Sequence, residues 1–163
     1  MQIMERTEII LNDLCKAFSF LEGHANIQRQ RRIFAEIPDE KRASIKEILR
    51  YLRDNMKFTF LCTITGLDIG DNFQVIYHLA DDGGILINLK ILTPRSKPVI
   101  ESVTSVFEGA VFYERELKDL LGIEVNGLPP GRRYPLPDGW PEGQYPLRKD
   151  WHQAEEEGAE KKS

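Results

Sequence analysis

The sequence is poor in the side chains that most often bind metals or close disulfides. Among 163 residues there are two cysteines and three histidines, and His24, His78 and His152 are far apart in the chain. Zinc sites and iron–sulfur clusters take several cysteine or histidine ligands at short spacing. We therefore expect no metal or redox cofactor in this chain. We expect Cys15 and Cys62 to be small buried hydrophobic residues rather than a disulfide pair, as in a protein of a reducing compartment.

Long apolar runs and an excess of positive charge are also missing. No run approaches 18 apolar residues, so we expect no transmembrane helix, and residues 1–6 do not resemble a secretory signal. The net charge is −4, whereas nucleic-acid-binding domains are usually basic. Arg29, Arg31 and Arg32 form one small basic cluster. We interpret it as a solvated surface, with a role as a nucleic-acid adaptor as the alternative.

The sequence contains none of the common glycine-rich or nucleophile motifs. It has no Gly-x-Gly-x-x-Gly, no Gly-x-x-x-x-Gly-Lys-Ser/Thr and no Gly-x-Ser-x-Gly, the motifs that position phosphates or a catalytic serine. A stand-alone hydrolase using Asp68, Asp71 or His78 stays open as an alternative, because catalytic partners can meet only in space. The pattern gives that alternative no positive support.

What the sequence does contain is clear periodicity. Apolar residues recur at three- and four-residue steps in several segments and at two-residue steps in others. These periods predict helices over residues 5–22, 38–52, 98–107 and 110–121, and strands over 32–37, 58–65, 73–79 and 85–91. The connection Asp81-Asp82-Gly83-Gly84 is typical of a tight hairpin. The fold class predicted is α+β, with a small, mostly antiparallel sheet packed with helices.

The character of the chain changes after residue 123. Residues 124–152 hold six prolines, which remove backbone donors and favour extended or turn conformations. Residues 153–163 are charged and lack large apolar side chains, which is typical of disorder. We therefore predict a globular α/β domain over 1–123, an extended proline-rich C-terminal arm over 124–152, and a disordered tail over 153–163.

The helix predicted over 110–121 is dense in charge. Glu114 and Lys118 are four residues apart, as are Arg115 and Asp119, and such pairs can form weak ion pairs on an exposed helix face. Gly122 follows as a helix C-cap. On this pattern alone, the helix is an ordinary solvated one with surface ion pairs.

The arm that follows changes this interpretation. Aromatic side chains, including Trp140 and Tyr145, stand among basic residues such as Arg132 and Arg148. Trp, Tyr and Arg are enriched among the residues that dominate binding energy at protein interfaces. Docking of the prolines into a proline-recognising domain is a weaker alternative. We predict that the helix and the arm together bind another protein.

Two motifs in this region, in the same order and at similar separation, resemble the 30 kDa (C-type) subunit of respiratory complex I. They are Glu114-Arg115-Glu116-x-x-Asp119-Leu120-x-Gly122-Ile123 and Pro146-Leu147-Arg148-Lys149-Asp150-Trp151, with Arg132-Arg133 between them. The similarity extends more loosely over residues 30–151. Gly127-Leu128-Pro129, where that family usually has Gly-His-Pro, and the connector 136–143 are more similar to the corresponding subunit of archaeal membrane-bound, energy-converting [NiFe]-hydrogenases and their sulfur-reducing relatives.

The resemblance implies a non-catalytic assembly subunit of a membrane-bound, ion-translocating complex. In such complexes this subunit lies on the cytoplasmic side, holds no redox centre and wraps its arm around a hydrogenase-like large subunit. An iron–sulfur small subunit and antiporter-like membrane subunits complete the assembly, and the [NiFe] centre and iron–sulfur clusters belong to those partners. A C-type subunit of a quinone-linked dehydrogenase is the alternative. The expected partner contacts come from Glu114, Arg115, Glu116, Asp119, Arg132, Arg133, Trp140, Tyr145, Leu147, Arg148, Lys149 and Asp150.

Overall fold

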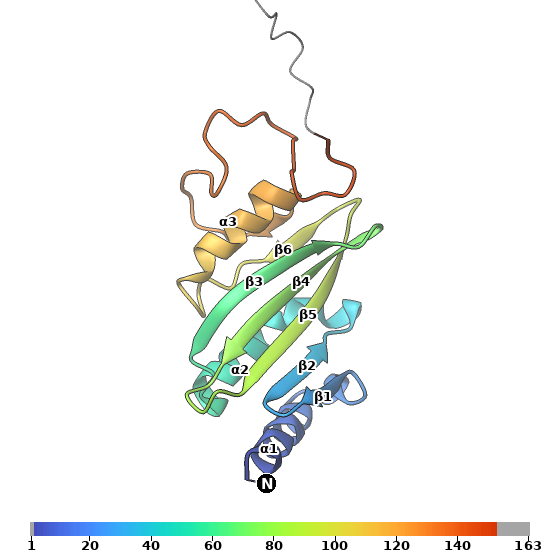
Figure 1. Cartoon of the computed structure of the whole chain (residues 1–163), viewed down its shortest axis with the longest axis vertical. Helices are drawn as coiled ribbons and strands as arrows, with labels where there is room; N and C mark the ends of the chain where they lie inside the picture. The colour runs from blue at the N-terminus through green and yellow to red at the C-terminus, as the bar shows by residue number, and fades with distance from the viewer. Residues whose placement is uncertain (1, 153–163) are drawn as a thin grey trace, which may run out of the picture.

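The computed structural model describes residues 2–152 and has the α+β architecture that the sequence predicts (Figure 1). The tail predicted over 153–163 lies outside the described residues. The helices are α1 Gln2–Ala17, α2 Ile45–Met56 and α3 Ala110–Leu121, with short 3-10 helices η1 Ser19–Leu21 and η2 Asp39–Ser44. The strands are β1 Ala25–Arg29, β2 Arg32–Glu36, β3 Phe60–Asp68, β4 Asn72–Ala80, β5 Leu86–Pro94, β6 Val99–Glu101 and β7 Glu124–Asn126.

The first five strands form one mixed sheet in the order β1-β2-β5-β4-β3. The predicted antiparallel meander of β3, β4 and β5 is confirmed, with Tyr77 opposite both Ile64 and Leu89. The hairpin between β4 and β5 is closed by the side chain of Asp81, whose carboxylate accepts a hydrogen bond from the backbone N–H of Ile85 at 2.8 Å. Gly84 supplies the positive φ that this turn needs.

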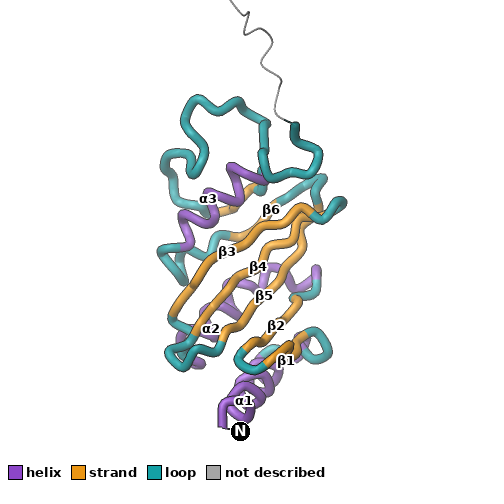
Figure 2. Tube along the Cα trace, viewed as in Figure 1, coloured by secondary structure: helices purple, strands orange, loops and turns teal. Residues whose placement is uncertain are grey.

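Helices cover one face of the sheet. In Figures 1 and 2, α2 crosses behind the central strands, α1 lies at the β1–β2 end, and α3 lies beside the edge strand β3. Alternate residues of β4 point into this side, so Phe73 and Tyr77 are fully buried with Leu52 of α2 and Leu14 of α1. Burying a large apolar side chain contributes roughly 1.5–3 kcal/mol, and this shared core therefore fixes the helices on the sheet.

Three parts of the fold differ from the prediction. Residues 124–126, predicted to begin the extended arm, form strand β7. Residues 98–107, predicted to be a helix, contain strand β6, which pairs in parallel with β7. The three- and four-residue spacing of Val99, Val103 and Val106 fits a helix, but long-range pairing overrides it. Strand β1 was not predicted, because its residues are mostly polar. It pairs with β2 on the outer edge of the sheet.

The cysteine prediction is partly wrong. Both cysteines are free thiols, as expected, but only Cys15 is partly buried, and Cys62 is exposed. Cys62 lies on edge strand β3, beside a bulge between Leu61 and Thr63. Period-two alternation says which residues share a face, but it does not say which strand will lie at the sheet edge.

Candidate partner-docking surface

Glu114 anchors the inner face of α3. Its side chain is fully buried, and its carboxylate accepts hydrogen bonds from the backbone N–H of Val103 at 2.6 Å and from the hydroxyl of Ser102 at 2.7 Å. Burial raises the pKa of Glu114, although both hydrogen bonds and Lys46 act in the opposite direction. The predicted surface ion pair with exposed Lys118 is therefore wrong. Glu114 ties the 102–104 loop to the helix instead.

Arg115 and Asp119 also turn to partners other than each other. The Arg115 guanidinium donates to the backbone carbonyls of Pro129 and Pro130, at 3.4 and 3.1 Å. Asp119 is buried, and the Nε atom of Arg133 lies 3.5 Å from its Oδ2 atom. Within residues 2–152, that oxygen has no hydrogen-bond donor. The predicted pair along the helix is thus replaced by contacts between the helix and the arm.

A hollow of about 530 Å³ remains between α3 and the arm. Four cationic side chains line it, those of Arg115, Lys118, Arg132 and Arg133, against the two carboxylates of Asp119 and Glu142. The lining of the hollow therefore has two more positive than negative side chains. An interface with an acidic segment of another protein would suit this charge, because complementary potentials favour the correct partner.

The end of the arm is fastened to the end of α3. The backbone N–H of Leu147 donates to the carbonyl of Leu120 at 3.0 Å, and Nε of Arg148 donates to the carbonyl of Leu121 at 2.7 Å. Last-turn carbonyls have no partner within their own helix, so the arm caps α3. The Arg148 guanidinium also lies 4.2 Å from the ring centre of Tyr145 and 5.3 Å from that of Phe73, within the range of cation–π attraction.

Asp68, at the end of β3, binds Lys149 of the arm directly and Asp150 through Arg95. Its carboxylate accepts from the backbone N–H of Lys149 at 2.9 Å and from that of Gly70 at 3.0 Å, and it pairs with Arg95. Arg95 also pairs with Asp150. Burial acts to raise the pKa of Asp68, but the bonds from Arg95, Lys149 and Gly70 outweigh it and lower this pKa to about 2.

The aromatic residues of the arm divide into a packed group and an exposed group. Trp140 and Trp151 lie with ring centres 6.1 Å apart, and both indole N–H groups donate to Gln144. Tyr134 stacks edge-on against Phe112 of α3, with ring centres 5.7 Å apart. Phe112 is 53% exposed and Tyr134 is 45% exposed. Phe112 was not among the predicted contact residues, and its place on the outer face of a charged helix is the signal that could have identified it.

The surface formed by α3 and residues 128–151, here called the α3–arm surface, contains ten of the twelve predicted contact residues. The other two, Glu114 and Asp119, belong to α3 but are buried beneath this surface. Many of them bind within the chain: Glu114, Arg133, Arg148 and Asp150 each have an internal partner. Leu147 is 53% exposed and contributes, with Glu116, to a smaller hollow beside β3. Their contacts with another protein stay a prediction. Arg132 and Lys149 are also exposed.

The residues of the alternative sites lie elsewhere. His78 faces the uncovered side of the sheet, where its ring nitrogens bond to Thr65 at 3.0 Å and to Asn88 at 2.6 Å. The carboxylate of Asp68 is engaged by Arg95 and the arm. The hydrolase residues proposed from sequence are therefore not assembled around one open site.

Gly122 should be the least replaceable glycine of the docking surface. Its φ is +72°, and a Cβ atom there would lie 2.5 Å from the Arg148 guanidinium and 2.6 Å from the Tyr145 ring. We expect Gly122→Ala to lower the free energy of unfolding by about 1–3 kcal/mol, because it combines backbone strain with a clash. Urea denaturation would measure this. Gly139→Ala, with no neighbour within 4 Å of its Cβ, is the control, and an equal effect of the two changes would contradict the close-approach argument.

Comparison with known protein families gives one clear answer. The model of the family described as "Respiratory-chain NADH dehydrogenase, 30 Kd subunit" matches residues 39–157, which include α3 and the arm. This chain belongs to that family. The resemblance seen in the two motifs is thereby confirmed over most of the chain.

Individual relatives agree with the family assignment. The C-type subunit of the F(420)H(2) dehydrogenase of Methanosarcina mazei is 36% identical over 87% of this chain and 89% of its own length. The membrane-bound hydrogenase subunit beta of Pyrococcus furiosus is 26% identical over 90% of this chain and 87% of its own length. The C/D subunit of the NADH-quinone oxidoreductase of Phocaeicola vulgatus is 39% identical over 73% of this chain, which corresponds to 22% of that longer protein.

Solved structures share the fold. A chain of the archaeal membrane-bound sulfane sulfur reductase superimposes with a TM-score of 0.79 over 91% of this chain and 86% of its own, at 24% identity. The trypsin-resistant fragment of Nqo5 superimposes with a TM-score of 0.61 over 77% of this chain and 99% of its own, at 28% identity. Within the described residues of the present chain, no helix is both long and apolar enough to span a membrane.

Proposed function

We propose that this protein is a non-catalytic assembly subunit in the peripheral arm of a membrane-bound, ion-translocating respiratory complex. It docks through the α3–arm surface on a hydrogenase-like large subunit, on the cytoplasmic side of the membrane. The iron–sulfur small subunit and antiporter-like membrane subunits join it through the complex, and the redox centres belong to those partners. The names of the relatives, all subunits of multi-subunit oxidoreductases, support this assignment.

The observation that carries the docking site is the exposure of large side chains on α3 and the arm. Phe112, Tyr134 and Leu147 are among the eight exposed large hydrophobic residues of the described chain. They stand beside an arm that is rich in arginine. Exposed apolar groups bordered by polar ones are typical of protein-binding surfaces.

The length of one relative also supports a large-subunit partner. The Phocaeicola vulgatus protein carries two letters, C and D, in its one name, and this chain matches only 22% of it. In that protein the segment that matches this chain is covalently part of one longer polypeptide that carries both letters. A separate C-type chain must replace that covalent link with a stable interface, roughly 2,000 Å² or more for an obligate complex.

Two branches of the family remain candidates for the complex itself. The departures at Gly127-Leu128-Pro129 and in the 136–143 connector favour the energy-converting [NiFe]-hydrogenase type. The higher identity to the F(420)H(2) dehydrogenase protein, 36% against 26% for the hydrogenase protein, favours a quinone-linked or related dehydrogenase. Nickel content of the purified complex separates them, because only the hydrogenase branch needs a nickel centre in its large subunit.

Docking can be tested without unfolding the chain. In the variant Phe112→Ser/Arg132→Glu, both replaced side chains are exposed in the free chain, so the fold should be retained. Because buried aromatic and arginine anchors dominate interfaces, we expect binding of the large subunit to weaken by about 30-fold or more. The measurement is recovery of the large subunit with tagged chain from gently solubilised membranes.

The matched control is Phe60→Ser/Arg29→Glu, which changes an exposed phenylalanine and an exposed arginine on the edge strands β3 and β1. Its recovery of the large subunit should equal that of the unchanged chain. Equal recovery with both variants would reject the α3–arm surface as the docking site. Purification of the unchanged chain alone, without any other subunit, would reject the assembly role.

A further inference from the structure

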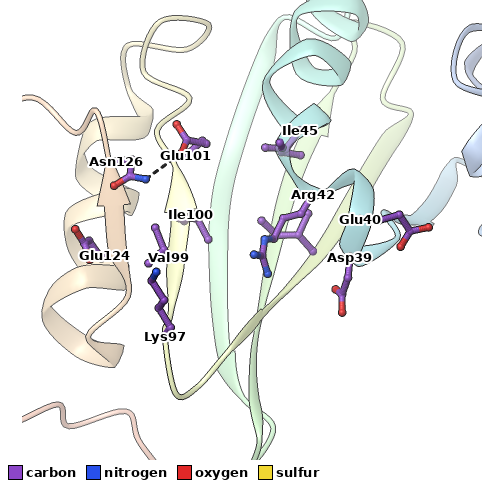
Figure 3. A pocket seen from close by; sticks show the side chains of 12 residues that line it. Asp39, Glu40, Arg42, Ile45, Lys97, Val99, Ile100, Glu101, Glu124 and Asn126 are labelled. Carbon is purple, nitrogen blue, oxygen red and sulfur yellow. Dashed lines mark hydrogen bonds between the residues drawn. The ribbon is translucent and has the colours of Figure 1, made fainter.

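A groove separates η2 from the small β6–β7 sheet (Figure 3). Its volume is about 600 Å³, and it shares no lining residue with the hollow of the α3–arm surface. Strand β7 lies between the two: Val125 lines the hollow, whereas Glu124 and Asn126 line the groove. The groove is therefore separate from the α3–arm surface, and a large subunit docked on that surface would not fill it.

The floor of this groove is apolar and its walls are fixed. Ile45, Ile91 and Ile100 lie at its base and are buried. The hydroxyl of Thr93 donates to the carbonyl of Val99 and accepts from its backbone N–H, both at 3.1 Å. These two bonds hold β6 at a set distance from β5. The groove thus exists before any partner arrives, which lowers the entropy cost of binding.

The rim of the groove is acidic. Four exposed carboxylates, those of Asp39, Glu40, Glu101 and Glu124, face two cations, Arg42 and Lys97, so two negative charges are not balanced. The rim of the groove therefore attracts a positively charged partner.

One of the two cations is directed away from the rim. Arg42 donates to the carbonyl of Leu92 at 2.9 Å and is thereby directed toward the sheet. Glu101 accepts its hydrogen bond from the neutral amide of Asn126 at 3.0 Å (Figure 3), so its charge is not cancelled.

Strand β6 offers an edge to an extended chain. In a parallel pair, alternate residues direct their backbone groups to the neighbouring strand. The backbone N–H and carbonyl of Ile100 point to β7. Those of Val99 and Glu101 point to the opposite edge of β6. The hydroxyl of Thr93 already bonds to the backbone N–H and carbonyl of Val99. The backbone of Glu101 therefore lies at the groove, where an added strand could pair with it.

From the apolar floor, the acidic rim and this strand edge, we infer that the groove binds an extended, lysine-bearing segment of another subunit of the complex. In an extended chain, alternate side chains point to opposite sides. One set then packs on the apolar side of the lining, where Ala43 and Val99 are accessible above buried Ile45 and Ile100. Lysines of the other set reach the rim carboxylates. This inference rests on the proposed function, since it takes the partner from the same complex.

Carbodiimide cross-linking of the purified complex tests the inference directly. The reagent activates a carboxylate, and a lysine amine that lies in contact with it then displaces the activating group to form an amide. Mass spectrometry should find Asp39, Glu40, Glu101 or Glu124 joined to lysines of one short segment of another subunit. If all four carboxylates of an intact complex are found without such links, the inference is overturned.

Charge reversal provides the second measurement. In Asp39→Lys/Glu101→Lys, cross-links from the remaining groove carboxylates, Glu40 and Glu124, to that segment should fall about tenfold, because two rim ion pairs become repulsive. Glu47→Lys/Glu108→Lys reverses two exposed charges outside the groove and should leave the links unchanged. Equal links in both variants would overturn the inference.

The outcome also separates this inference from the proposed function. A complex that retains its large subunit but shows no groove links would remove the groove and keep the assembly role. Failure to recover any complex with the unchanged chain would remove both.

Discussion

Glu114→Ala is expected to lower the free energy of unfolding by about 2–4 kcal/mol at neutral pH. The carboxylate is fully buried and is the acceptor for two donors, the backbone N–H of Val103 and the hydroxyl of Ser102. Removing it leaves the backbone N–H of Val103 buried without a partner and leaves the Ser102 hydroxyl with the hydroxyl of Thr104 alone. It also leaves a cavity at the junction of α3 and the loop. Urea denaturation followed by circular dichroism gives the change.

Glu116→Ala is the matched control for this prediction. Glu116 lies two residues further along the same helix and is only partly buried. Its replacement should change the free energy of unfolding by less than about 0.5 kcal/mol. The conservative Glu114→Gln keeps one carbonyl acceptor and should fall between the two. If Glu114→Ala and Glu116→Ala cost the same, the buried anchor has no special role.

Asp68→Asn is expected to release the end of the arm. The aspartate joins β3 to a residue 81 positions later in the chain, through the backbone N–H of Lys149, and it pairs with Arg95. Without the charge, both interactions weaken. Because hydrogen bonds to charged groups contribute about 1.5–3 kcal/mol, amide exchange at Lys149 should accelerate by about tenfold or more. Hydrogen exchange with mass spectrometry measures this in the full chain.

The same carboxylate makes arm attachment dependent on pH. The pKa of Asp68 is lowered from 3.8 to about 2, so the folded state binds fewer protons here than the unfolded state does. The stabilisation is present above the unfolded pKa and is lost as the pH falls from about 4 toward 2. Arm release on acidification should follow this window in the unchanged chain and be absent in Asp68→Asn.

Asp71→Asn serves as the control for both measurements. Asp71 is exposed in the same β3–β4 turn, and its side chain is not part of the cluster around Arg95. Exchange at Lys149 should stay as it is in the unchanged chain. Equal acceleration in the two variants would show that the turn, rather than the Asp68 carboxylate, holds the arm.

The elements that local rules govern could be predicted from the sequence. The period of two in β4 and β5 gave their faces and their antiparallel pairing, because a short hairpin leaves few other arrangements. Gly122 gave the end of α3, since a residue with positive φ is needed there. Strands β1 and β6 could not be predicted in this way, because the one is too polar and the other is too short to carry a period.

For the α3–arm surface, too, some features could be predicted from the sequence and others could not. Its location, α3 followed by a proline-rich arm, and its family motifs are properties of the sequence alone. Which side chains stay available to a partner was decided by tertiary structure. Spacing of four residues puts Arg115 and Asp119 on one helix face, but it does not say whether solvent or another segment covers that face.

Distance along the chain is the physical reason for this limit. The sequence determined an α+β fold with an arm that needs contacts, through periodicity, turn residues and composition. Only the tertiary structure turned Glu114 inward, because Ser102 and Val103 supply donors there. It alone brought Asp68 to Lys149. Local propensities act over a few residues, whereas donors from distant segments decide whether a charged side chain is exposed or buried.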